Sequence, residues 1–146
     1  MQIRKMGIAD YDEVYSLWTS CKGMGLNSLD DTKDGIAKFL RRNPDTCFVA
    51  LIDDKIIGAI LVGTDGRRAY IYHTAVHPDY RKQGVAKSLV DTTLSAVENL
   101  GINKVALVVF SRNQIGNDFW EKMGFTTRED IIYRNKTIKE FVRIDT

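Results

Sequence analysis

The chain has 146 residues, 44% of them hydrophobic and 27% charged, which is typical of a globular protein. Its formal net charge of +2 is too small to indicate binding to nucleic acid or to an anionic membrane surface. The length suits one domain with a sizeable core, so we expect residues 1–146 to form a single domain.

Cysteine usage and the N-terminus narrow the class of protein further. Cys21 and Cys47 belong to no CxxC pair and no Cys/His cluster, so the sequence predicts no metal site. Residues Met1–Lys5 lead into no apolar signal-peptide core, and no apolar run approaches the roughly 20 residues of a membrane span. These features predict a cytoplasmic protein.

The first third of the chain predicts one short strand and two helices. In chain order these are a strand at Gln2–Met6, a helix from Asp10 to Thr19 and, after a glycine-rich loop, a helix from Thr32 to Arg42. Val14, Leu17 and Trp18 recur at helical spacing and predict the buried face of the first helix.

The rest of the chain alternates strands with two more helices. We expect strands at 46–52, 56–62 and 69–76, a helix at 84–100, a strand at 105–110, a helix at 113–123 and strands at 126–134 and 137–144. The nearly continuous apolar run Val105–Phe110 is typical of a strand that is covered on both faces. The order β-α-α-β-β-β-α-β-α-β-β predicts an α/β (α+β) fold, a mixed central sheet of about seven strands with helices on both faces.

The most informative stretch runs from Thr74 to Lys87, where an apolar strand passes through a Pro-marked turn into a basic loop that begins a helix. A helix start presents several backbone N–H groups without helical partners, and the helix dipole adds partial positive charge there. Gly84 and Ala86 leave room for a close ligand. The stretch therefore predicts a cradle for a phosphate-bearing cofactor.

The segment Arg81-Lys82-Gln83-Gly84-Val85-Ala86 resembles the cofactor signature Gln/Arg-x-x-Gly-x-Gly/Ala of the GCN5-related N-acetyltransferase (GNAT) superfamily. Asn113 and the segment Phe119–Phe125 resemble that family's later Asn…Tyr-x-x-x-Gly-Phe pattern. The expected element order agrees with the family across nearly the whole chain. Within the family, the sequence resembles small bacterial acetyltransferases of the ribosomal-protein-acetylating type.

The resemblance implies acetyl-CoA as the donor substrate. The residues that it places at the cofactor are Thr74, Ala75, Val76, Arg81, Lys82, Gln83, Gly84, Val85, Ala86, Lys87, Asn113 and Trp120. Loop N–H groups are expected to hold the pyrophosphate, and the strand end to pair with the pantetheine arm, with the thioester between this strand and Val105–Phe110. Arg81 and Lys87 fit either phosphate contacts or ordinary surface charges, and Asn113 also fits a helix N-cap.

The resemblance further implies an N-acetyltransferase that moves the acetyl group to a primary amine by direct attack in a ternary complex. Neither cysteine is expected near the thioester, which argues against a covalent acetyl-cysteine route. Trp120 stands where many relatives carry a Tyr acid, and Val108 stands roughly where the ribosomal-protein branch carries a Glu base. These departures keep a second hypothesis open, a non-catalytic module that binds acyl-CoA as a sensor or partner-binding subunit.

Local candidates for proton transfer lie on the strand at 69–76. Alternation places Tyr70 and Tyr72 on one face of the strand and His73 on the other, unless a bulge shifts the register. Tyr72 is the first candidate for an acid or water-positioning group, and His73 is a candidate base because imidazole titrates near neutral pH. A half-buried strand tyrosine and a core histidine are the alternative interpretations.

The acceptor side is predicted at the early loop. Asp30 and Asp31 fit either attraction of a cationic amine or capping of the helix that follows. The acceptor itself, a small-molecule amine or a protein amine, is not specified by the sequence. No nucleic-acid or membrane partner is predicted, and the fold is compatible with a homodimer through the late strands.

Overall fold

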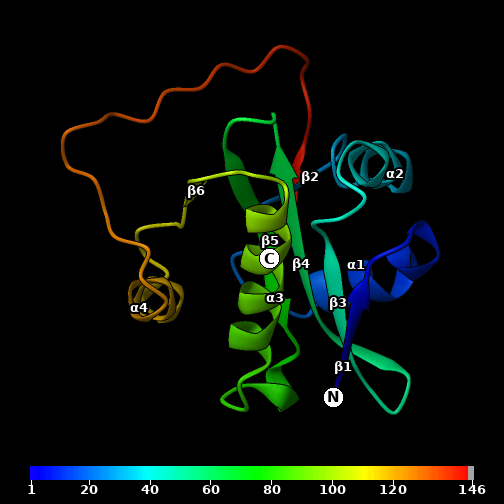
Figure 1. Cartoon of the computed structure of the whole chain (residues 1–146). Helices are drawn as coiled ribbons and strands as arrows, with labels where there is room; N and C mark the ends of the chain where they lie inside the picture. The colour runs from blue at the N-terminus through cyan, green and yellow to red at the C-terminus, as the bar shows by residue number, and fades with distance from the viewer. Residues whose placement is uncertain (145–146) are drawn as a thin grey trace.

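The computed structural model describes residues 1–144 and contains a five-stranded sheet with helices on both faces (Figure 1). Its strands, in spatial order, are β1 (Gln2–Lys5), β3 (Phe48–Ile52), β4 (Lys55–Thr64), β5 (Ala69–Val76) and β6 (Val105–Leu107). The first four strands pair antiparallel, and β6 pairs with β5 in parallel. A second, two-stranded sheet joins β2 (Leu26–Asn27) to β7 (Arg143–Ile144). The predicted mixed α+β class is confirmed.

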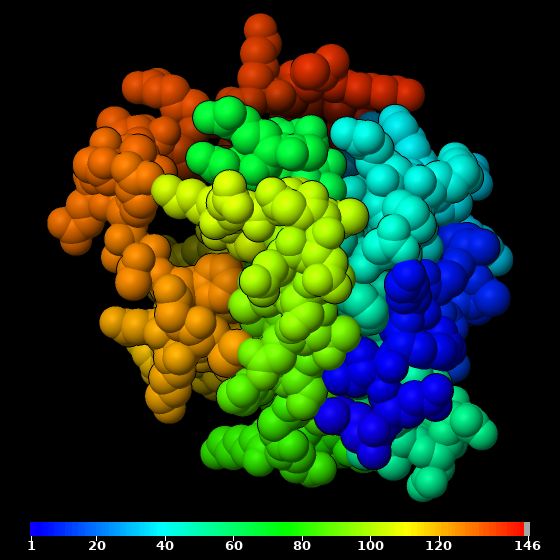
Figure 2. All heavy atoms as spheres, in the orientation of Figure 1, coloured from blue at the N-terminus to red at the C-terminus, as the bar shows by residue number. Residues whose placement is uncertain are grey.

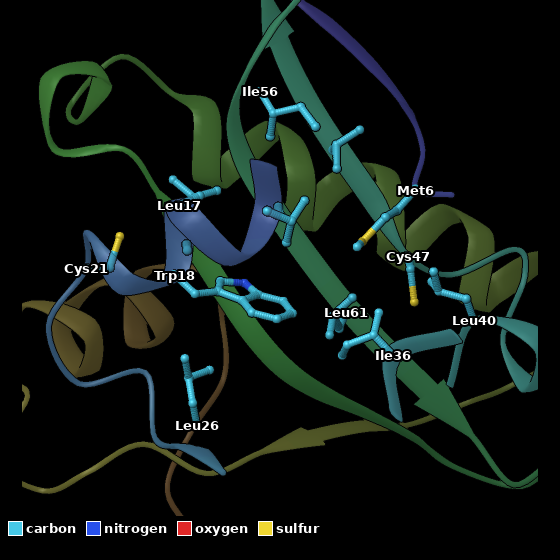
Figure 3. Packing of buried hydrophobic residues seen from close by; sticks show 14 of the residues in the cluster. Met6, Leu17, Trp18, Cys21, Leu26, Ile36, Leu40, Cys47, Ile56 and Leu61 are labelled. Carbon is cyan, nitrogen blue, oxygen red and sulfur yellow. The ribbon is translucent and has the colours of Figure 1, made fainter. Parts of the chain in front are cut away.

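Two helices pack on each face of the five-stranded sheet. These are α1 (Tyr11–Thr19) and α2 (Lys33–Arg42) on what we call the α1/α2 face, and α3 (Val85–Asn99) and α4 (Gln114–Lys122) on the α3/α4 face. Trp18 is fully buried in the core of the α1/α2 face, where it lies near Ile36 and Leu61 (Figure 3). On the other face, Leu89 and Val90 of α3 are fully buried against the sheet.

The predicted helices are confirmed to within one residue at most ends. Thr32 and Asn113 cap α2 and α4, because each side-chain oxygen accepts a hydrogen bond from the backbone N–H three residues later. Asp10 occupies the position before α1, but its side chain accepts no hydrogen bond from an N–H of that helix. Its carboxylate instead accepts a hydrogen bond from Gly7 N at 2.9 Å and pairs with Arg4 at 2.8 Å, which fixes the short helix η1 (Ile8–Asp10) against β1.

A β-bulge in β5 changes which face its side chains occupy. Ile60 of β4 pairs with Thr74 and Val62 pairs with Ile71, so Leu61 alone lies opposite both Tyr72 and His73. Leu61 belongs to the core of the α1/α2 face, whereas Ile60 and Val62 belong to that of the α3/α4 face. Tyr72 and His73 therefore both point to the α1/α2 face. Simple alternation, which separated them, is overridden by the bulge.

The late part of the sheet differs from the sequence expectation. β6 ends at Leu107, and Val108 is 58% exposed, so the run 105–110 is not a strand covered on both faces. Residues 125–142 form no strand, so the two late strands predicted at 126–134 and 137–144 are wrong apart from β7. This segment leaves α4, passes outside β6 and returns to β2 (Figures 1 and 2). The count of about seven strands in one sheet becomes five plus two.

The two cysteines and the apolar character of the helices can also be described. Cys21 and Cys47 are both buried and form no disulfide, and burial raises the pKa of the Cys47 thiol to about 11. Within residues 1–144, no helix is long and apolar enough to cross a membrane.

Close backbone packing at Gly35 joins the start of α2 to the loop before it. A Cβ at this position would lie 2.4 Å from the Asp30 carbonyl oxygen and 2.5 Å from that of Leu29. Because the neighbouring atoms are backbone, we expect Gly35→Ala to reduce the free energy of unfolding by about 2 kcal/mol. Urea denaturation measures the change. Gly7→Ala is the control, since a Cβ there meets nothing within 4 Å; equal effects of the two variants would contradict the packing argument.

Candidate active site

The central feature of the candidate site is a cleft between β5 and β6. These strands pair over only three residue pairs, from Ala69–Val105 to Ile71–Leu107, and then part. A cleft of about 450 Å³ opens beyond this point, with walls from the loop at 23–25, β5 at 70–74, residues 107–110, and Asn113, Trp120 and Tyr133. The cleft occupies the gap in which the sequence predicts the thioester.

The start of α3 follows the loop that leaves β5, and the backbone N–H groups there have no hydrogen-bond partner among the described residues. Ser88 N is the first amide of the helix to find a partner, Gly84 O, at 3.0 Å. Within residues 1–144, no backbone N–H of residues 83–87 donates a hydrogen bond. Gly84 is the N-cap residue with a left-handed φ of 79°, and Lys82 also has a positive φ of 60°. The loop thus has the free donors and the helix start that a pyrophosphate requires.

Gly84 owes its identity to backbone conformation. A Cβ at this position would meet no protein atom within 4 Å, but the left-handed φ favours glycine. The space beside the N–H groups is therefore open, which fits a ligand that approaches the backbone closely.

The two flanking cations of the loop have protein partners. Arg81 Nε donates to the Val76 carbonyl oxygen at 3.3 Å, and Lys87 Nζ pairs with Asp91 at 2.6 Å along α3. Both side chains are on the surface, so these contacts are weak and a phosphate can compete for them. The backbone N–H groups of residues 83–87 are therefore stronger candidates for binding an anion than the side chains of Arg81 and Lys87.

The end of β5 points a backbone group toward the parted edge. His77 N donates to Ile57 O of β4 at 2.8 Å, and successive residues of a strand alternate in direction, so the Val76 N–H faces away from β4. It is a candidate donor to a developing oxyanion. Cys21 Sγ lies 3.5 Å from Val76 O on this strand end. Cys21 is buried and does not line the cleft.

The α4 residues expected at the cofactor reach the cleft. Asn113 caps α4 and also lines the cleft, so its two expected roles coexist in one place. Trp120 lines the cleft and packs edge-on against Phe119 and Phe125, with ring centroids 5.0 and 5.2 Å away. An indole N–H only donates hydrogen bonds, and Val108 beside it carries no ionisable group. Neither position supplies an acid or a base.

Two tyrosines in tilted ring contact form part of the β5 wall of the cleft. The ring centroids of Tyr70 and Tyr72 are 4.7 Å apart, and Tyr72 also meets Phe39 of α2 edge-on. Burial raises the pKa of Tyr70 to about 12, with smaller effects from the nearby tyrosines. Burial also raises the pKa of Tyr72, and the proximity of Tyr133 and Asp30 adds to the shift. Both phenols keep their protons at neutral pH and remain hydrogen-bond donors.

His73 and Asp31 form a close pair that sequence reasoning did not foresee. His73 Nε2 lies 2.6 Å from Asp31 Oδ1, and the side chains are 15% and 5% exposed. The histidine also lines the cleft. Thr32 caps α2, so the capping role that the sequence offered for Asp31 is wrong. The pair joins residues 42 positions apart, and the bulge that brings it together leaves no recognisable pattern in the chain.

Asp30 remains on the surface beside the cleft. Its carboxylate accepts a hydrogen bond from Asn27 Nδ2 at 3.0 Å, and its charge contributes to the raised pKa of Tyr72. Phe110 is a wall residue that the sequence placed within a covered strand, and it packs 3.5 Å from the position of a Cβ on Gly25. Among the described residues, no cluster of three or more His, Cys, Asp and Glu side chains is placed to hold a metal.

Comparison with known proteins decides the family. The sequence model of the Acetyltransferase (GNAT) family matches residues 11–125. The chain belongs to this family. An acetyltransferase of Sodalis glossinidius is 30% identical over 140 residues, which cover 96% of this chain and 97% of that protein. An acetyltransferase of Pectobacterium atrosepticum is 29% identical over 140 residues, which cover 96% of this chain and 98% of that protein.

Solved structures share the fold. Ard1 from Thermoplasma volcanium matches with a TM-score of 0.77 and 25% identity, over 86% of this chain and 82% of that one. The aminoglycoside N-acetyltransferase AAC(6')-Iy, solved in complex with CoA, matches with a TM-score of 0.71 over 93% of this chain and 99% of that one. At 21% identity, the second likeness supports the fold alone. This GNAT protein is an acetyl-CoA-dependent acetyltransferase.

Gly84 and Gly101 provide a matched test of the anion site. They flank α3 with nearly equal left-handed φ values of 79° and 78°, and a Cβ at either position meets nothing. We expect Gly84→Glu and Gly101→Glu to cost about 1 kcal/mol each in backbone strain. Only Gly84→Glu should abolish thermal stabilisation by CoA, because its carboxylate repels phosphate at the free N–H groups. Full stabilisation of Gly84→Glu by CoA would contradict the site.

Proposed function

We propose that this acetyltransferase transfers the acetyl group to a primary amine by direct attack while donor and acceptor are bound together. The parting of β5 and β6 beside the free N–H groups of residues 83–87 carries this proposal. Acetyl-CoA bound there would supply an activated acyl group on a good leaving thiolate. The chain's own residues would bind the phosphates, align the thioester along the parted edge of β5, and move protons.

The residues proposed at the donor are those of the strand end, the loop and α4. They are Thr74, Ala75, Val76, Arg81, Lys82, Gln83, Gly84, Val85, Ala86, Lys87, Asn113 and Trp120. We expect the Val76 N–H to stabilise the oxygen of the carbonyl under attack, since a preorganised backbone donor acts there without reorganisation.

Tyr72 and His73 are the proposed proton-transfer residues. Both lie on the α1/α2 face of β5 and both line the cleft. The neutral phenol of Tyr72 donates toward the departing sulfur, and His73 accepts a proton from the attacking nitrogen. No other imidazole lines the cleft, because His77 lies beyond the strand at its turn.

The acceptor is proposed to enter from the side of the early loop. Asp30 is exposed there and close enough to Tyr72 to influence its pKa, so its charge attracts a cationic amine. Both small-molecule amines and protein amines fit an opening of this kind. Gly23 and Gly25 line the cleft on that side.

Amine acetylation can be tested with a panel that contains polyamines, amino acids, aminoglycosides and peptides with free N-termini or lysines. We expect thiol release from acetyl-CoA with at least one class, and a fall of about tenfold or more in kcat for Tyr72→Phe. Tyr15→Phe on α1, outside the cleft, is the control and should retain wild-type kcat. CoA binding without turnover on any amine would contradict the proposal and support a non-catalytic acyl-CoA-binding module.

A homodimer through residues 126–142 is also proposed. Ile131, Ile132 and Ile138 in this segment are 58%, 78% and 97% exposed, which favours burial against a second copy. We expect sedimentation velocity to show a dimer that Ile138→Asp shifts toward monomer, while Asn135→Asp in the same segment leaves it unchanged. A monomer at every accessible concentration would contradict this arrangement.

A further inference from the structure

The contact between Asp31 and His73 has a consequence for catalysis. We infer that Asp31 is a positioning residue: its buried carboxylate holds the neutral imidazole of His73 with the ring proton on Nε2, so that Nδ1 is the atom that receives the proton of the attacking amine. The inference rests on the proposed amine acetylation, and it specifies which nitrogen of His73 acts as the base in that reaction.

The Asp31 side chain is fixed independently of His73. Its second oxygen, Oδ2, accepts a hydrogen bond from Asn27 N at 2.8 Å, and its backbone oxygen accepts one from the Tyr11 hydroxyl at 2.6 Å. Among the described residues, no Lys or Arg forms an ion pair with Asp31. The backbone and the carboxylate of Asp31 are thus held by two different segments, and Oδ1 is directed at one partner, the imidazole.

The direction of the hydrogen bond sets the tautomer of the ring. An ionised carboxylate only accepts hydrogen bonds, so Nε2 of His73 must carry a proton to bond Asp31 at 2.6 Å. In a neutral imidazole the other nitrogen, Nδ1, then holds the lone pair. A basic nitrogen therefore occupies a defined position on the ring.

Nδ1 has no partner in the described part of the chain and is exposed to solvent. Within residues 1–144 it forms no hydrogen bond, and the only buried side-chain polar atoms without a partner are Trp18 Nε1 and Thr93 Oγ1. Nδ1 is consequently in contact with solvent, and His73 lines the cleft that receives the reactants.

The ring plane is fixed as well. The His73 ring meets that of Trp18 at 76°, with centroids 4.8 Å apart, and Trp18 is fully buried. An imidazole held at its edge by Asp31 and by packing against Trp18 cannot rotate freely about χ2. Fixed groups of this kind lower the cost of bringing a base and a nucleophile together.

The proton and the bonds balance in the transfer. The amine nitrogen forms a bond to the acyl carbon, the carbon–sulfur bond breaks, and the sulfur leaves with the bonding electrons. The proton lost by the nitrogen goes to Nδ1, and the imidazolium so formed keeps its Nε2–H bond to Asp31. Tyr72 can donate to the departing sulfur.

The tautomer can be read without any turnover. The chain has only two histidines, so ¹⁵N NMR of the imidazole nitrogens resolves both, and a His73→Gln variant assigns them. We expect neutral His73 in the wild-type protein to carry its proton on Nε2. His77 is an internal reference, because its Nδ1 accepts from Asp79 N at 3.2 Å. A proton on Nδ1 of His73 in the wild-type protein would overturn the inference.

Asp31→Asn tests the consequence for rate. Asn27 N still needs an acceptor, so the amide oxygen should stay on that side and the NH₂ group should face Nε2. The ring proton is then displaced to Nδ1 and the base is lost. We expect kcat to fall about 100-fold while KM for acetyl-CoA and stabilisation by CoA stay unchanged.

One control variant separates a positioning role from a structural one. Asp34→Asn, an exposed carboxylate three residues on in α2, should leave kcat and the His73 tautomer unchanged. Wild-type kcat in a folded Asp31→Asn protein would overturn the inference even if amines are acetylated. Absence of amine acetylation by the wild-type protein would instead refute the proposed function, and the NMR result would still decide the state of the pair.

Discussion

The way in which β5 is bonded on its two edges governs the rest of the structure. On one edge it pairs with β4 along nearly its whole length, and on the other it pairs with β6 over three residue pairs only. The strand is thereby held in register while half of one edge stays open. The open edge supplies one wall of the cleft and, at Val76, a backbone N–H that faces away from β4. A one-residue slip of β5 would exchange the faces of Ile71 and Ala75, which are buried in different cores, so the register is strongly fixed.

The bulge at Tyr72 and His73 is built into the same strand. Two residues opposite Leu61 place a phenol and an imidazole on one face at adjacent positions, which regular alternation forbids. The phenol packs against Phe39 of α2 and the imidazole against Trp18 of α1. Each proton-transfer candidate is therefore supported by a different helix, and the packing of both helices against the sheet determines the geometry of the cleft.

The buried carboxylate of Asp31 is tolerated because both of its oxygens have hydrogen-bond partners. Asp31 has a backbone donor on one oxygen and the imidazole on the other, and Thr32, not Asp31, caps the helix. The missing Cβ of Gly35 lets the first turn of α2 approach the Asp30 carbonyl and keeps the loop in this position. The family positions at Trp120 and Val108 carry no acid or base, yet Tyr72 and His73 line the cleft and Asp31 pairs with the histidine. The proposed proton-transfer residues therefore lie on β5 instead of on α4 and β6.

The sequence by itself determined the elements and the donor site. Helical periodicity, the strand pattern at 69–76 and the loop at 81–87 are local features, and local features fix where α3 begins and which N–H groups are free. It could not determine the late strands, because strand-like composition at residues 126–142 does not by itself specify pairing, and in the structure these residues pair with no edge of the five-stranded sheet. Nor could it place His73 beside Asp31, since a bulge depends on how β4 and β5 are matched and not on either strand alone. Contacts between distant segments decided the pairing of His73 with Asp31 and the shape of the cleft.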